Sequence, residues 1–128
     1  MVDEKKTNEP SVRFPRERRI RKQREFDVVW KTALFAADHV LVVKAAFLGA
    51  TTPTRLGLSV GRKHGNAVVR NRWKRLIRDS FRRNCGSLSA GLDLVVGPQK
   101  GAQPVLADVE ASLIRLVDRI AKKVAGKK

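Results

Sequence analysis

The chain has 128 residues, of which 42% are hydrophobic, enough for one domain with a buried core. Its 28 Lys and Arg residues against 12 Asp and Glu give a formal net charge of +16, and such self-repulsion favours a polyanionic partner. No stretch approaches the roughly 20 apolar residues of a membrane span, the N-terminus does not resemble a secretory signal, and the lone Cys85 excludes an intramolecular disulfide. We therefore expect a cytoplasmic protein without zinc, with nucleic acid as the first candidate partner and an anionic membrane surface as the second.

The N-terminal segment divides into a tail and an arm. Residues 1–12 have little to bury, and we expect them to be disordered. Residues 13–22 are strongly basic but carry two apolar anchors, Phe14 and Ile20. These anchors favour an extended arm laid on the domain over a solvated charged tail.

The spacing of residues 25–33 predicts a short helix, because Phe26, Val29 and Trp30 lie on one stripe. The residues alone favour core positions for both Phe26 and Trp30. The alternative is that their rings are half exposed and offer surfaces on which bases stack.

Three segments have the composition of strands. Residues 39–48 form an apolar, β-branched run and predict a central strand. Residues 54–60 alternate and predict a second strand, antiparallel to the first. Residues 92–96 predict a short strand that ends at the turn signal 97–98. A short edge strand is also expected just before His39.

A strongly basic stretch from Arg62 to Arg83 contains nine Lys and Arg residues and one acid, Asp79. Asn66 is a favourable N-cap for a helix here, and Cys85-Gly86 supplies its end. Apolar residues recur at the spacing of one helix face: Val69, Trp73, Leu76, Ile77 and Phe81. At about 100° per residue, the opposite arc carries Asn71, Lys74, Arg75, Arg78 and Arg82. Because ordinary surfaces mix both signs of charge, this arc predicts a nucleic-acid face rather than a solvated one.

A last helix is predicted to open at Pro104, and residues 126–128 are expected to fray. Its apolar stripe consists of Leu106, Val109, Leu113, Leu116, Val117, Ile120 and Val124. The order of helix, strands, helix, strand and helix predicts an α/β sandwich with helices packed on one small sheet. Residues 54–96 form a strand–helix–strand crossover, for which the default hand is right.

The sequence shows no catalytic constellation. His64 is the histidine nearest the basic helix, but no nucleophile with a matched acid stands beside it, so we interpret it as a solvent-exposed loop residue. His39 is interpreted as a surface residue. Asp79, Asp93 and Asp108 stand singly, without the pairing that metal-dependent phosphoryl chemistry needs. The residues thus indicate a binding module, and they do not decide between DNA and RNA.

One long motif resembles the protein component of bacterial ribonuclease P. It consists of Arg55-Leu56-Gly57-Leu58-Ser59-Val60 and then Arg62-Lys63-His64-Gly65-Asn66-Ala67-Val68-Val69-Arg70-Asn71-Arg72-Trp73-Lys74-Arg75-Leu76-Ile77-Arg78. The segments 24–30 and 93–98 are also similar to family motifs, and the resemblance covers about residues 13–120. The chain departs from the family at Gly61, where many relatives have Ser or Lys, and at Gly97, where Ala is more usual.

The resemblance implies a two-layer α/β (α+β) sandwich, with about four strands in a small mixed sheet and three helices in the order α-β-β-β-α-β-α. This fold is similar to the second domain of a ribosomal protein of the small subunit, and its βαβ crossover is left-handed, against the default stated above. It would be a single domain over residues 13–125.

The resemblance also implies a function: a non-catalytic protein subunit of an endoribonuclease that removes the 5′ leader of precursor tRNA. The RNA subunit would carry the chemistry with Mg²⁺ held mainly by RNA, while the protein alone binds no cofactor. Its partners would be the RNA subunit and precursor tRNA, without a membrane or an obligate protein partner. The open alternative is a general structured-RNA or ribosome-associated binding protein without a processing role.

The implied site residues form two sets and include no catalytic residue. The set for the RNA subunit is Arg62, Lys63, Asn66, Arg70, Asn71, Arg72, Lys74, Arg75 and Arg78. The set for the leader cleft, between the first helix and the sheet, is Phe14, Phe26, Trp30, Arg62 and Lys100. For Phe26 and Trp30, the resemblance favours rings that pack the helix and still leave an edge for a base.

Overall fold

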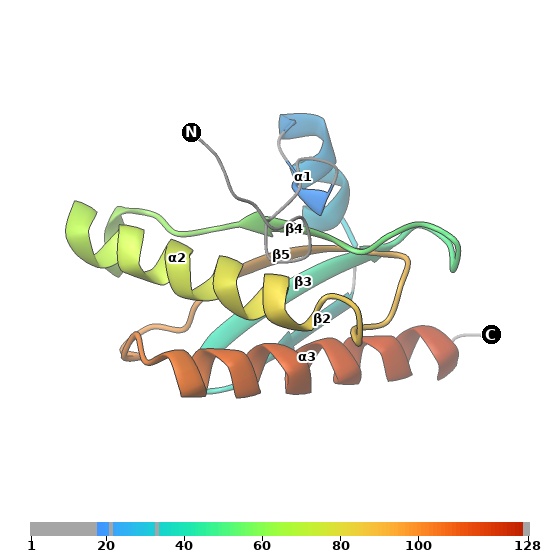
Figure 1. Ribbon diagram of the computed structural model, residues 1–128. Coiled ribbons are helices and arrows are strands. Elements are labelled where there is room, and N and C mark those ends of the chain that lie inside the picture. Colours follow the sequence, from blue (N-terminus) through green and yellow to red (C-terminus); the bar gives the residue numbers. More distant parts are fainter. Residues whose placement is uncertain (1–17, 21, 33, 127–128) are drawn as a thin grey trace, which may run out of the picture.

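The structure is a computed structural model that describes residues 18–20, 22–32 and 34–126 (Figure 1). Its elements follow the predicted order α-β-β-β-α-β-α. They are α1 (Gln23–Trp30), β2 (Leu34–Ala37), β3 (Leu41–Phe47), β4 (Arg55–Leu58), the 3₁₀ turn η3 (Arg62–His64), α2 (Ala67–Asn84), β5 (Leu92–Pro98) and α3 (Leu106–Gly126). The edge strand expected before His39 is β2.

The four strands form one mixed sheet in the order β2-β3-β5-β4. β3 is central, as predicted, and pairs antiparallel with both β2 and β5. β4 pairs parallel with β5, which confirms a crossover through α2. β4 therefore runs antiparallel to β3 as predicted, but β5 lies between them. Every residue of β5 is buried, and such a strand needs a neighbour on each edge. The hand of the crossover stays a prediction.

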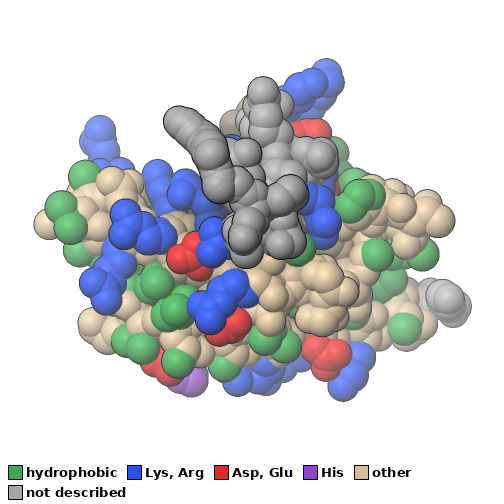
Figure 2. All heavy atoms as spheres, viewed as in Figure 1, with side chains coloured by type: hydrophobic (Ala, Val, Ile, Leu, Met, Phe, Trp, Pro, Cys, Tyr) green, Lys and Arg blue, Asp and Glu red, His purple; other side chains and the backbone are tan. Residues whose placement is uncertain are grey.

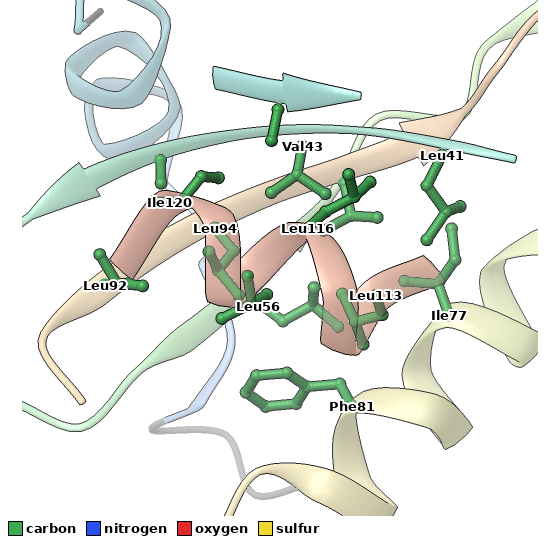
Figure 3. Close-up of a cluster of buried hydrophobic side chains, with 14 of the residues drawn as sticks. Leu41, Val43, Leu56, Ile77, Phe81, Leu92, Leu94, Leu113, Leu116 and Ile120 are labelled. Carbon is green, nitrogen blue, oxygen red and sulfur yellow. The ribbon is translucent and has the colours of Figure 1, made fainter. Parts of the chain in front are cut away.

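One face of the sheet carries the main core. Because side chains alternate along a strand, Val43 of β3 and Leu94 of β5 point to the same face. Helices α2 and α3 pack side by side over it (Figures 1 and 3). Their contributions include Ile77, Phe81, Leu113, Leu116 and Ile120, all fully buried. This packing fixes α2 as a rigid element.

Among the residues that the structure describes, the other face carries only α1 and the arm that precedes it. Ile20, Val29, Ala46 and Val95 form a small second cluster there, and Phe26 packs against it. Since α1 is short, it covers only part of this face, and Lys44 of β3 stays half-buried there.

The arm predicted over residues 13–22 is confirmed where the structure describes it. The Ile20 N–H donates to the Leu56 carbonyl at 2.8 Å, and Arg18 Nε donates to the Thr54 carbonyl at 2.8 Å. Ile20 is buried, so it is an anchor as expected. Phe14 and the tail at 1–12 lie outside the described residues.

Several predicted element ends differ from the structure, and the first helix, predicted to residue 33, ends at Trp30. β5 continues through Gly97 and Pro98, which pair with β3. A Cβ on Gly97 would lie 2.3 Å from the Ser59 carbonyl oxygen. The close approach of the backbone at Ser59, and not a turn, therefore explains this glycine. α3 begins at Leu106 rather than at Pro104 and extends to Gly126, and the fraying of residues 126–128 stays a prediction.

α2 ends where the sequence predicted, at Asn84 with Cys85 as its C-cap, although Gly86 does not adopt a left-handed conformation. The Asn84 side chain instead donates to the Ser80 carbonyl at 2.8 Å and to Glu110 Oε2 at 2.7 Å. The helix therefore ends at a side-chain contact with α3.

Candidate nucleic-acid interface

Helix α2 carries most of the Lys and Arg residues of the strongly basic stretch and is held in place by its N-cap and its buried face. Asn66 is its N-cap, as predicted, and its side-chain oxygen accepts a hydrogen bond from the Val69 N–H at 3.0 Å. The predicted inner face is also confirmed: Trp73, Ile77 and Phe81 are buried. Figure 2 shows Lys and Arg side chains gathered over α2. The helix thus holds its cations in a fixed arrangement that suits a structured partner.

The nine residues predicted for the RNA subunit all lie on η3 and α2 or at the junction between them. The exposed members are Arg62, Lys63, Asn66, Asn71, Arg72, Arg75 and Arg78, whereas Arg70 and Lys74 are half-buried. The members on α2 do not all lie on the same side of the helix. Arg72 Nε donates to the Pro104 carbonyl at 3.3 Å, on the side of α3. Lys74 and Arg78 lie on the opposite flank.

A groove of about 740 Å³ separates α2 from the arm, α1 and β4. Its lining combines apolar and cationic residues: Arg19, Ile20, Phe26, Leu56, Gly57, Leu58, Val60, Lys74 and Arg78. It therefore brings Phe26, predicted for the leader, together with Lys74 and Arg78, predicted for the RNA subunit. Phe26 is half-buried, so it both packs α1 and leaves part of its ring accessible.

Trp30 is 46% exposed, so its residue-based assignment to the core is wrong. Val29 takes the buried position on α1 instead. Lys44 Nζ of β3 lies 5.0 Å from the centre of the Trp30 ring, a cation–π contact. Phe35, which pairs with Lys44 across β2 and β3, is 44% exposed. This part of the open sheet face combines aromatic rings with a cation.

Sequence reasoning missed Lys44. Its signal was available, because Lys44 is the one charged side chain between Val40 and Phe47 of an otherwise apolar run. A charge at that position is tolerated only on a face that reaches solvent.

A second cavity of about 470 Å³ lies where β3 begins and β5 ends. Its lining joins two basic residues of different segments, Lys63 and Lys100, to Val42, His64, Trp73, Pro98, Gln99, Gly101 and Ala102. Val42 and Lys44 share one face of β3, because they are two residues apart. The open face of β3 thus runs from Trp30 towards Lys100.

His64 is partly buried in this second cavity, so its interpretation as a solvent-exposed loop residue is wrong. Its Nδ1 accepts a hydrogen bond from the Gly61 N–H at 3.1 Å. Burial, together with the charge of Lys63, lowers the pKa of His64. A neutral imidazole therefore holds the turn that presents Arg62 and Lys63.

The predicted leader residues do not converge on one cavity. Phe26 lines the groove beside α2, and Lys100 lines the second cavity. Trp30, the last residue of α1, contacts Lys44 on the sheet face. Arg62 is exposed on η3 and lines neither cavity. Within the ranges that the structure describes, no three His, Cys, Asp or Glu side chains form a metal-binding group, and no helix could cross a membrane.

Comparison with known proteins gives a consistent result. The family model described as Ribonuclease P matches residues 14–121. The ribonuclease P protein component of Brevibacillus brevis is 37% identical over 105 residues, which cover 81% of this chain and 83% of that protein. The one from Finegoldia magna is 35% identical over 112 residues, or 85% of this chain and 96% of that protein.

Solved structures agree with these relatives. The RNase P protein of Staphylococcus aureus superposes with a TM-score of 0.69 at 33% identity, over 82% of this chain and 95% of that one. The RNase P protein from Thermotoga maritima gives a TM-score of 0.69 at 33% identity, over 79% of this chain and 96% of that one.

Proposed function

Because the chain belongs to the ribonuclease P protein family, and its role is that of the protein subunit of this endoribonuclease, we propose how its surfaces bind RNA. One surface binds the RNA subunit of the enzyme and the other binds the 5′ leader of precursor tRNA. The observation that carries the proposal is the arrangement of a rigid cationic helix on one face of the sheet and accessible aromatic rings on the other.

The surface for the RNA subunit is the outer side of η3 and α2. Its residues are Arg62, Lys63, Asn66, Arg70, Asn71, Arg72, Lys74, Arg75 and Arg78. Arginine binds phosphate through two parallel hydrogen bonds and stacks on bases, so an Arg-rich helix suits folded RNA. Side chains cannot read the deep major groove of an RNA helix, so we expect contacts to backbone and to unpaired bases.

The surface for the leader begins at Phe26 and Trp30 on α1 and follows β3 to Lys100. A single-stranded leader offers a base for each accessible ring and a phosphate for each cation along its path. Lys44, beneath Trp30, joins this surface. Arg62 lies between the two surfaces and serves either, and Phe14, outside the described residues, is proposed for the mouth of the cleft.

The chemistry is assigned to the RNA subunit, with Mg²⁺ held mainly by RNA and none by the protein alone. Two acids of α1 and the sheet, Glu25 and Asp93, support this assignment, because Arg55 binds both of them. The protein supplies no catalytic residue in this scheme. It binds and orients RNA in the cytoplasm, without an obligate protein partner.

Reconstitution tests the proposal. The RNA subunit alone should cleave precursor tRNA slowly at low Mg²⁺, and adding the protein should restore 5′ processing by lowering the repulsion between the two RNAs. Cleavage of precursor tRNA by the purified protein without any RNA would contradict the proposal. Equal affinity for random duplex RNA and for the RNA subunit at one salt concentration would favour the alternative, a general structured-RNA binder.

A further inference from the structure

Helix α1 is too short to hold its place unaided. It has eight residues, and isolated helices of this length are marginal in water. Val29 is its one buried side chain, so the hydrophobic contact with the sheet is small. Additional contacts must therefore fix where α1 presents its two aromatic rings.

Arg55 of β4 makes the most specific of these contacts. Its Nε and Nη2 donate to the two carboxylate oxygens of Asp93 at 2.8 and 2.6 Å, a fork that leaves little rotational freedom. Its Nη1 donates to Glu25 Oε2 on α1 at 3.1 Å. The hydrogen bond to Asp93 raises the pKa of Arg55 despite partial burial, and Glu25 raises it further. Arg55 therefore reaches from the sheet to α1 as a permanently charged, pre-oriented group.

Two further contacts fix α1 around this link. A Cβ on Gly57 would lie 2.8 Å from Phe26 Cε1, so the glycine lets the Phe26 ring rest directly on β4. Beyond the other end of α1, the Thr32 hydroxyl donates to the Ala45 carbonyl of β3. The helix is thus held near both ends, and Glu25 carries the only ion pair between α1 and the sheet among the described residues.

We propose that Arg55 is a positioning residue for precursor tRNA binding, because through Glu25 it sets the place of α1 and so presents Phe26 and Trp30 to the leader. This inference rests on the function proposed above. Arg55 touches no RNA in this scheme; it acts through α1.

The decisive variant is Glu25→Gln. Glu25 also accepts from the Lys22 N–H at the start of α1, and glutamine serves this capping role as well as glutamate. The variant therefore removes the charge that Arg55 binds and leaves the Arg55–Asp93 fork in place. We measure the Kd of the assembled holoenzyme for precursor and for mature tRNA. The preference for precursor should fall about twofold to fivefold, with unchanged affinity for the RNA subunit.

The sign of this effect separates positioning from general electrostatics. Removing an acid from a surface that binds RNA should tighten binding if charge alone acts, whereas loss of positioning weakens it. Asp27→Asn is the matched control, since Asp27 is an exposed acid of the same helix whose partner is Gln23, at 3.0 Å. This control should leave the preference for precursor unchanged or slightly higher.

A double-mutant cycle adds an independent readout. Arg55→Lys keeps the charge but loses the fork, so Glu25→Gln should weaken the precursor preference less in this background than in the wild type. Wild-type preference in Glu25→Gln, or the same loss in Asp27→Asn, would overturn the inference. Absence of any precursor preference in the wild-type holoenzyme would instead overturn the proposed leader surface.

Discussion

Trp30 keeps nearly half of its surface exposed although tryptophan is the largest side chain available for a core. An exposed ring over a lysine, on a strongly basic protein, is well placed to stack on a base while the lysine meets a phosphate. The cost of exposing the ring is then explained by binding rather than by folding.

Replacing Trp30 by Ala should weaken precursor binding by the holoenzyme by about 1 to 3 kcal/mol, the usual worth of one stacked base. Mature tRNA lacks the leader, so its affinity should not change. Phe47→Ala is a suitable control, because Phe47 is an aromatic of similar exposure (45%) at the end of β3. Equal losses for precursor and mature tRNA would contradict a leader contact.

Asp38 is a structural acid in the turn between β2 and β3. Its carboxylate accepts from the N–H groups of Val40 and Leu41 at 2.8 and 2.9 Å, from the Ser112 hydroxyl at 2.8 Å and from Arg115 Nη2 at 2.5 Å. Burial alone would raise the pKa of Asp38, but these hydrogen bonds outweigh it and hold the pKa well below its usual range.

Stability should therefore depend on Asp38 in a predictable direction. Because the pKa of Asp38 is lower in the folded chain, the unfolded chain binds the proton first as the pH falls below about 3.8. The stabilisation of the folded state by the Asp38 carboxylate is therefore fully present above that pH and is lost as the pH falls further towards the folded pKa. Asp38→Asn should cost about 1 to 3 kcal/mol of unfolding free energy at neutral pH and less near pH 3. Urea unfolding at both pH values measures this. A constant difference, or an equal cost for the exposed Asp118→Asn, would argue against it.

Among the secondary-structure elements, α2 could be predicted from the sequence, because its apolar residues keep a strict helical period and Asn66 marks its start. β5 could not be predicted to its end. Gly97 and Pro98 read locally as a turn, but the strand continues because the Ser59 carbonyl approaches Gly97 and the chain still pairs with β3. The placement of β5 between β3 and β4 is equally non-local.

The site shows the same division between local and non-local information. The cationic arc of α2 follows from residue spacing alone. Which aromatic of α1 stays accessible depends on Gly57, Ala46 and Val95, which lie far from α1 in the sequence. Likewise, His64 enters a cavity because the end of β5 passes beside it, which no local pattern indicates.

For the whole molecule, with a net charge of +16, some of the described basic residues form ion pairs with acids and others do not. Several acids are committed to particular bases, as in Arg55–Asp93, Arg115–Asp38 and Lys122–Asp118. By contrast, within the described ranges no ion pair joins Arg75 or Arg78 of α2 to an acid. The charges of Arg75 and Arg78 therefore remain available to an RNA on the outer side of α2.

Salt dependence tests whether this face, and not the total charge, binds the RNA subunit. If about six phosphates are neutralised, the logarithm of the association constant should fall with the logarithm of salt concentration at a slope of roughly −4 to −5. The double variant Arg75→Ala/Arg78→Ala should flatten that slope by about 1.5, because it removes two phosphate contacts. Arg119→Ala/Lys122→Ala removes the same charge from exposed positions on α3 and should leave the slope unchanged. If both variants flatten the slope equally, the RNA responds to net charge, and the binding face is not confined to η3 and α2.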